Sequence, residues 1–123
     1  MARILIAEDD AQVRGFVARA LADDGHETAV AADGAEALDT LARKNGDFDL
    51  LLTDIKMPVM DGIALALSAV RDHPELVILL MTGFADQRER AQGLDALIHD
   101  VIAKPFSLDQ IKGAVKEALT VRR

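Results

Sequence analysis

Two short segments of the chain are apolar at nearly every position, with no alternation of apolar and polar residues. They are the LLLT run at Leu50–Thr53 and the VILLM run at Val77–Met81. A strand has this composition when both faces of its sheet are covered, as when helices pack on each side of a parallel sheet. We therefore expect a buried parallel sheet between two layers of helices. These two runs constrain the fold more than any other feature of the sequence.

Three more apolar runs fit strands of the same sheet: Ile4–Ala7, Thr28–Ala31 and Val101–Ala103. The longer segments between the runs carry apolar residues every three or four positions, which is typical of amphipathic helices. Four stripes stand out: Val13, Phe16, Val17, Ala20 and Leu21; Ala35, Leu38, Leu41 and Ala42; Ile63, Ala66, Leu67 and Val70; Leu108, Ile111, Val115 and Leu119. Residues Asp86–Ala96 form a weaker stripe and are predicted as a short helix. Five strand–helix repeats predict an α/β, doubly wound parallel sheet with about five helices on its two faces.

Composition limits the other possibilities. The 123 residues are enough for one domain, and no linker divides residues 1–123. The absence of cysteine excludes disulfides and thiolate metal sites, and the formal charge of -7 disfavours direct nucleic-acid binding. No apolar run approaches the roughly 20 residues of a membrane span, and the MARILIAEDD start is not a signal peptide. We expect a cytoplasmic protein with no membrane or nucleic-acid partner.

Polar side chains follow four of the five predicted strands. Because the carboxyl ends of parallel strands meet at one edge of a sheet, these side chains should lie near one another. In chain order they are Glu8, Asp9 and Asp10, then Asp54, then Thr82, and last Lys104. Taken singly, each has an ordinary explanation, such as a solvated loop or a β-branched strand residue. Their combination at successive strand ends favours a functional site.

These residue types suit phosphoryl transfer. Clustered carboxylates repel one another, and a hard cation such as Mg²⁺ relieves that repulsion. Asp54 would then remain an anion and act as a nucleophile, while Lys104 and Thr82 would offer a cation and a hydroxyl donor to phosphoryl oxygens. Pro105 would stiffen the loop after Lys104, and its peptide bond is compatible with a cis conformation.

The order of these motifs is specific. Glu8–Asp9, Asp54 followed by MPVMDG, Thr82, and the Lys104–Pro105–Phe106 triplet resemble the receiver domains of bacterial two-component response regulators. The resemblance covers essentially the whole chain. It implies a flavodoxin-like fold with strand order 2-1-3-4-5. It also implies that a histidine kinase or histidine phosphotransfer protein donates a phosphoryl group to Asp54.

The resemblance also implies a role for each residue of the motifs. Asp9 and Asp54 would bind Mg²⁺, or Mn²⁺ in its place, directly, with the backbone carbonyl of Lys56 as a third ligand. Glu8 would reach the metal through a water molecule, and Asp10 would have an accessory role at most. Thr82 and Lys104 would contact the phosphoryl group. The chain would catalyse only its own phosphorylation and dephosphorylation and would not be an enzyme acting on other substrates.

Two positions depart from the family pattern. Val101, three residues before the lysine, stands where the family often has an aromatic residue that rotates inward on activation. Phe84 either substitutes for that aromatic or simply packs on the surface. Lys56 flanks the path of a water attacking the phosphorylated aspartate, so it either slows hydrolysis or only faces solvent.

The sequence shows no effector domain, which predicts a single receiver domain that acts by binding proteins. The MARIL start, the TGF triplet at 82–84 and the non-aromatic residue before KPF resemble cell-cycle receivers that adapt substrates to a bacterial protease. That resemblance implies a protease, or its substrates, as the downstream target.

Three other functions compete with this interpretation. An aspartate-nucleophile phosphatase generally needs a second acid two residues after the nucleophile, where this chain has Lys56. A module that binds partners without phosphorylation is disfavoured by the intact set of acids, threonine and lysine. Flavin binding lacks both an aromatic residue placed to stack the ring and a Ser/Thr-rich loop after the first strand.

Overall fold

The computed structural model describes residues 2–83, 91, 93–94 and 96–120. Five parallel strands form one sheet in the order β2-β1-β3-β4-β5. The strands are β1 (Arg3–Ala7), β2 (Glu27–Ala31), β3 (Leu50–Asp54), β4 (Val77–Thr82) and β5 (Asp100–Ala103). The helices among the described residues are α1 (Ala11–Asp23), α2 (Gly34–Arg43), α3 (Gly62–Asp72) and α5 (Leu108–Thr120). The predicted α/β fold and strand order are confirmed.

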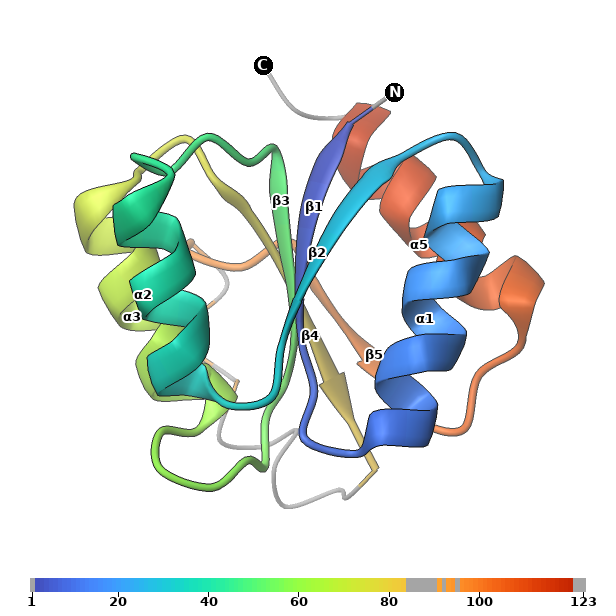
Figure 1. Cartoon of the computed structure of the whole chain (residues 1–123), viewed down its shortest axis with the longest axis horizontal. Coiled ribbons are helices and arrows are strands. Elements are labelled where there is room, and N and C mark those ends of the chain that lie inside the picture. Colours follow the sequence, from blue (N-terminus) through green and yellow to red (C-terminus); the bar gives the residue numbers. More distant parts are fainter. Residues whose placement is uncertain (1, 84–90, 92, 95, 121–123) are drawn as a thin grey trace.

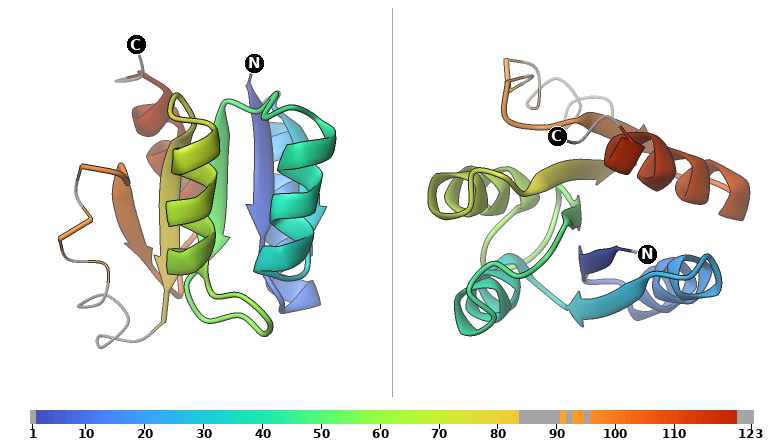
Figure 2. Two further views of the ribbon diagram at one scale, coloured as in Figure 1. Left: turned by 90° about the vertical axis from the view of Figure 1, so that its left-hand side faces the viewer. Right: turned by 90° about the horizontal axis from the view of Figure 1, so that it is seen from above.

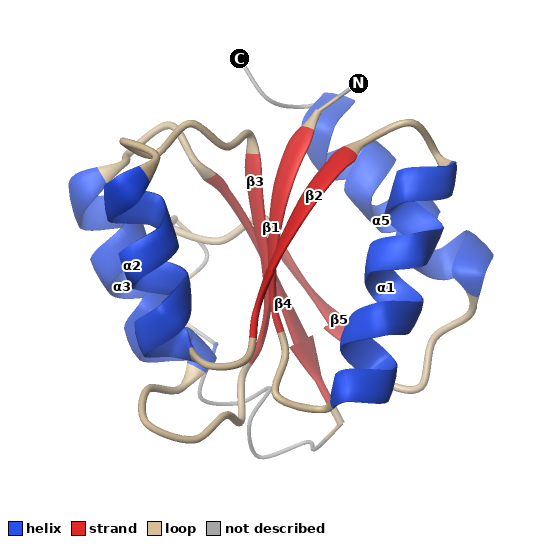
Figure 3. Cartoon of the chain, viewed as in Figure 1, coloured by secondary structure: helices blue, strands red, loops and turns tan. Residues whose placement is uncertain are grey.

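The sheet lies between two helical layers. Helices α2 and α3 cover one face, and α1 and α5 cover the other (Figures 1 and 3). Successive side chains of a strand point to opposite faces. On β3, for example, Leu51 joins the core under α2 and α3, while Leu50 and Leu52 join the core under α1 and α5. Both faces are therefore buried, which explains the continuous apolar composition of the central strands.

Each described helix begins at a residue whose side chain caps its free backbone N–H groups. Asp10 accepts hydrogen bonds from the N–H groups of Gln12 and Val13, and Asp33 and Asp61 cap α2 and α3 in the same way. At α5, Ser107 and Gln110 form reciprocal side-chain to backbone bonds. The loops that end in these caps carry the site.

The four described helices agree with the expected number of about five. The predicted helix at 86–96 falls mostly outside the described residues, and so does Phe84. In the part of the chain that is described, each helix is too short or too polar to cross a membrane. Figure 2 shows the strands side by side, with the loops at their carboxyl ends gathered along one edge of the sheet.

Candidate functional site

The crevice of the sheet opens between the carboxyl ends of β1 and β3. From β1 the chain runs first to β2 on one side and then to β3 on the other, and this reversal leaves a gap between the connecting loops. The gap is a cleft of about 610 Å³. Its lining residues are Glu8, Asp9, Asp10, Asp54, Lys56, Met57, Pro58, Gly83 and Lys104. The structure therefore brings together both predicted acidic segments and the predicted lysine.

Three carboxylates meet in this cleft. Glu8 is fully buried, Asp54 is 6% exposed, and Asp9 is open to solvent. One carboxylate oxygen from each lies within 4.8 Å of the other two. Oxygen donors at this spacing, with one side open to water, fit a hard cation such as Mg²⁺, which keeps several of its waters when bound.

Lys104 connects the two buried acids. Its Nζ lies 2.7 Å from Glu8 Oε1 and 3.1 Å from Asp54 Oδ2. Lys104 follows β5, and its backbone N–H donates to the carbonyl of Thr82 at the end of β4. The Lys104–Pro105 peptide bond is cis. The sheet edge thus delivers one ammonium group to two carboxylates that come from strands far apart in the sequence.

Burial controls the protonation of these groups. It raises the pKa of Asp54, and the nearby charge of Asp9 acts in the same direction, while Lys104 opposes the rise. Burial likewise raises the pKa of Glu8 against the hydrogen bond from Lys104. For Lys104, burial alone would lower the pKa, but the bonds and charges of the two acids outweigh it and the pKa rises. The cleft therefore disfavours two bare carboxylates and favours any cation that can join them.

The backbone fixes the direction of Asp54. The N–H of Ile55 donates to Asp54 Oδ1 at 3.0 Å, and the N–H of Gly62 donates to the carbonyl of Ile55 at 2.7 Å. A Cβ atom at Gly62 would lie only 2.0 Å from the backbone oxygen of Asp54. Only glycine fits there, because the start of α3 packs directly on the end of β3. This contact is the physical reason for the glycine of the MPVMDG motif, and the preceding Asp61 caps α3.

The acidic loop after β1 has anchors that the motifs did not reveal. Asp10 N–H donates to Glu8 Oε2 at 3.0 Å, and the Arg14 guanidinium donates to the Glu8 carbonyl at 2.9 Å. Asp10 therefore serves as a helix cap and loop anchor, consistent with an accessory role. An aspartate directly before a helical stripe signals such a cap. Nothing in the sequence pattern marked Arg14.

Of the other predicted residues, Lys56 lines the cleft, whereas Thr82 and Val101 are not among its lining residues. Thr82 ends β4 and is buried, and Lys56 is exposed on the rim. Val101 is half-buried on β5 and packs against the core under α2 and α3, away from the cleft lining. The metal-ligand role of the Lys56 carbonyl, the effect of Lys56 on hydrolysis, and the consequence of Val101 remain predictions.

Comparison with known proteins agrees with this geometry. Residues 4–116 match the family model described as the response regulator receiver domain. The chain belongs to the response regulator receiver family. It is 39% identical over 119 residues to the response regulator receiver protein CpdR of Brucella abortus. The match covers 97% of this chain and 98% of that protein. It spans only 24% of the Escherichia coli regulator NtrC and 50% of the mycobacterial regulator MprA, which it also matches.

Solved receiver structures are close to this one. The CheY-like receiver domain protein of Methanospirillum hungatei has a TM-score of 0.89 and 30% identity, covering 99% of this chain and 96% of that one. The response regulator TrrA of Thermotoga maritima, in complex with Mg²⁺-BeF, has a TM-score of 0.83 and 28% identity, covering 96% and 99%. The receiver fold predicted from the sequence is therefore confirmed.

Proposed function

We propose that this receiver domain accepts a phosphoryl group on Asp54 from a phosphohistidine donor and changes its protein-binding surface in response. The arrangement of Asp54 supports this most directly. Its carboxylate is nearly buried, faces an ammonium group, and lies close to the carboxylates of Glu8 and Asp9. Such a carboxylate is oriented for attack, with positive charge already in place for the incoming phosphoryl oxygens.

In the proposed transfer, one oxygen of Asp54 attacks the phosphorus of the donor, and the bond from phosphorus to the histidine nitrogen breaks. The released imidazole keeps the electron pair of that bond and takes up a proton from water. Glu8, Asp9 and Asp54 are the side chains that would hold Mg²⁺ or Mn²⁺, which would neutralise charge on the transferring group. Lys104 would exchange its bond to Asp54 for one to the phosphoryl group, and Thr82 would donate its hydroxyl to the same group.

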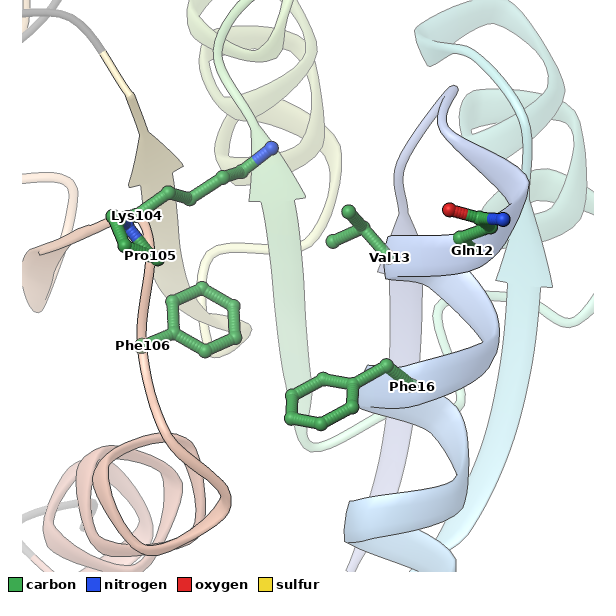
Figure 4. A pocket seen from close by; sticks show the side chains of 6 residues that line it. All are labelled: Gln12, Val13, Phe16, Lys104, Pro105 and Phe106. Atoms are coloured by element: carbon green, nitrogen blue, oxygen red, sulfur yellow. The ribbon is translucent and has the colours of Figure 1, made fainter.

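The donor needs a surface beside the cleft. An apolar groove of about 390 Å³ runs between α1 and the loop from β5 to α5 (Figure 4). Phe16 and Phe106 form its opposite walls, while Lys104 lines both this groove and the acidic cleft. Phe16 is 39% exposed, so part of its ring is available for apolar contact with a partner. Because the groove leads directly to Lys104, we propose it as the docking surface for the phosphohistidine donor.

The first experiment is intact-mass measurement after incubation with acetyl phosphate or phosphoramidate, with Mg²⁺ or with chelator. We expect a gain of one phosphoryl group that requires Mg²⁺ and disappears in Asp54→Ala. Wild-type labelling of Asp54→Ala would refute the assignment of the phosphoacceptor. If neither labelling nor beryllofluoride binding occurs, the chain is instead an interaction module that works without phosphorylation.

The groove is tested separately with Phe16→Ala. Transfer from a purified histidine kinase that labels the wild type should slow, because the donor loses apolar contact area. Labelling by acetyl phosphate should stay unchanged, because a small molecule needs no docking surface. Leu67→Ala is a matched control, since Leu67 is 44% exposed, lies on α3 and is outside the groove. Equal kinase rates for Phe16→Ala and wild type would exclude the groove as the docking site.

For the output we propose protein binding by a single receiver domain. The identity with CpdR over nearly the full length of that protein supports this proposal, as does the resemblance to protease-adaptor receivers. Capture of partners with the beryllofluoride-loaded and unloaded forms tests it. A partner set that is identical for the two forms would contradict a phosphorylation-controlled output.

A further inference from the structure

Gly34, the first residue of α2, touches the loop that follows β3 at very short range. A Cβ atom built on Gly34 would lie 2.5 Å from the backbone oxygen of Met60, and 2.9 and 3.0 Å from its Cβ and Cγ. Real Cβ atoms essentially never approach a backbone atom so closely. The connection from β2 to α2 therefore fits against the β3–α3 loop only because residue 34 has no side chain.

This glycine is not required by the backbone conformation. The described glycines with positive φ are Gly25, Gly46 and Gly93, and Gly34 is not among them. Alanine would also be the better residue in a helix. Gly34 is moreover buried, so a partner molecule cannot be the reason for the missing side chain. The close approach of Met60 is the reason that remains.

The loop that Gly34 contacts forms one wall of the acidic cleft. Lys56, Met57 and Pro58 line the cleft, and the loop then turns back on itself, with the Met60 N–H donating to the Pro58 carbonyl at 2.7 Å. Val59, at the centre of this turn, has a φ of 70° and is 83% exposed. A β-branched residue in this conformation is held there by its surroundings.

The second half of the loop, which is largely exposed, contacts α2 where Met60 lies against Gly34. The first half of the loop is fixed by the buried Met57, and its end is fixed by Gly62 against Asp54. Pro58 and Val59 are exposed, and Met60 packs partly against the core and closely on Gly34. Moving the Met60 carbonyl would therefore displace the exposed Pro58–Val59 turn, and Pro58 lines the cleft.

We propose that Gly34 is a positioning residue for the metal site, because it lets the β3–α3 loop sit close enough to the sheet for Mg²⁺ to be bound with good geometry. The inference rests on the proposed function, which assigns the cleft to Mg²⁺. It adds a residue that lies on a different loop and contributes no ligand atom. Because the proposed ion is Mg²⁺, the test can compare its binding with that of Ca²⁺, which is less sensitive to the geometry of the site.

Mg²⁺ and Ca²⁺ respond differently to a displaced loop. Mg²⁺ requires nearly ideal octahedral geometry at about 2.0–2.1 Å, while Ca²⁺ accepts irregular geometry at about 2.3–2.6 Å. A shift of the loop should therefore weaken Mg²⁺ binding more than Ca²⁺ binding. A general loss of stability would not change the ratio of the two affinities once the protein is folded.

The test compares Gly34→Ala with Gly113→Ala by calorimetric titration with MgCl₂ and with CaCl₂. Gly113 is a matched control, because it is also helical, is exposed on α5, and has no atom within 4 Å of a built Cβ. We expect Gly34→Ala to weaken Mg²⁺ about 10-fold or more, as changes around metal ligands commonly do, and to weaken Ca²⁺ clearly less. Gly113→Ala should bind both ions like the wild type.

A second variant covers the case in which Gly34→Ala does not fold. Met60→Ala introduces no clash and only removes the side chain that packs the loop against Gly34. It should lower the ratio of Mg²⁺ to Ca²⁺ affinity in the same direction, by a smaller factor. Wild-type affinities and an unchanged ratio in every folded variant of Gly34 and Met60 would overturn the inference.

A failure of the proposed function itself has a different signature. In that case the wild-type chain binds no Mg²⁺, or Asp54→Asn binds it as tightly as the wild type, and the positioning role falls with the metal site. If instead the wild type binds Mg²⁺ and Asp54→Asn does not, the comparison of Gly34→Ala with Gly113→Ala decides the inference alone.

Discussion

The chain has one acidic cluster at the carboxyl ends of its strands and another at their amino ends. The two clusters, at the carboxyl edge and the amino edge of the sheet, differ in the burial of their acids and in the groups that these acids bind. At the carboxyl edge, Glu8 and Asp54 are buried and share Lys104. At the amino edge, a groove of about 450 Å³ is lined by acids that are all at least partly open to solvent. Its acidic residues are Asp47, Asp49, Asp72 and Glu75.

At the amino edge, three of these acids bind three different donor groups, two of which belong to Arg3. Asp47 pairs with the Arg3 guanidinium, Asp49 accepts the Arg3 backbone N–H at 2.8 Å, and Asp72 lies 3.1 Å from Arg71. The hydrogen bond from Arg71 lowers the pKa of Asp72, whereas burial raises the pKa of Asp54. A cluster of negative charge is therefore no sign of a site by itself. What distinguishes the carboxyl-edge cluster is the burial of two acids around one shared cation.

The largest expected difference between the clusters is in stabilisation by Mg²⁺. An ion that binds only the folded state stabilises it by about 2.7 kcal/mol when present at 100 times its dissociation constant. Wild type and Asp72→Asn should both show this gain in thermal unfolding with added MgCl₂. Asp54→Asn should lose most of it. A Mg²⁺-dependent rise in Tm that survives in Asp54→Asn would place the ion elsewhere.

The next largest effect is the drop in the free energy of unfolding when the basic residue of a cluster is replaced in metal-free buffer. Removing one partner of a fully buried ion pair costs about 3–5 kcal/mol. Because Lys104 is 22% exposed and the acids can take up protons, we expect roughly 1–3 kcal/mol from Lys104→Gln in urea unfolding. Added Mg²⁺ should recover part of this loss. Arg71→Gln, at the other edge, should leave the unfolding curve unchanged, and equal losses for the two variants would break the comparison.

The dependence of stability on pH should also have opposite signs at the two edges. The folded-state pKa values of Glu8 and Asp54 are raised above their ordinary values of 4.5 and 3.8. Above these values the folded protein holds protons that the unfolded chain has released. The free energy of unfolding of the metal-free protein should therefore fall as the pH rises through the raised pKa values.

Urea unfolding of the wild type and Asp54→Asn from pH 4 to pH 8 measures this term. The fall should be smaller in Asp54→Asn, because one of the two groups no longer titrates, and it should shrink in the wild type with added Mg²⁺. A metal-free wild type that gains stability across this range through its acidic cleft would show that Lys104 outweighs burial. That result would reverse the assigned direction of both carboxyl pKa shifts.

The sequence predicted the strands because their signal is local, and the resemblance to receiver domains supplied their order. Continuous apolar runs at β3 and β4 identify buried strands, and motif order identifies the cleft residues Asp9, Asp54 and Lys104. The contacts between loops could not be predicted in this way. Gly34 and Met60 are 26 positions apart in sequence, and Arg14 contacts a carbonyl rather than a side chain. Such contacts depend on how the loops pack, which no local periodicity records.

The smallest expected effect belongs to the Arg71–Asp72 pair. The lowered pKa of Asp72 means that its contribution to stability is present above its ordinary value of 3.8 and is lost as the pH falls through its folded-state value. Both groups are fully exposed, so salt screens their attraction, with a Debye length of about 8 Å at physiological ionic strength. Asp72→Asn should therefore unfold like the wild type in urea at about 150 mM salt, with a difference appearing only at low ionic strength. If Asp72→Asn lost as much stability as Lys104→Gln at both salt concentrations, burial would no longer explain the contrast between the clusters, and the amino-edge groove would need a function of its own.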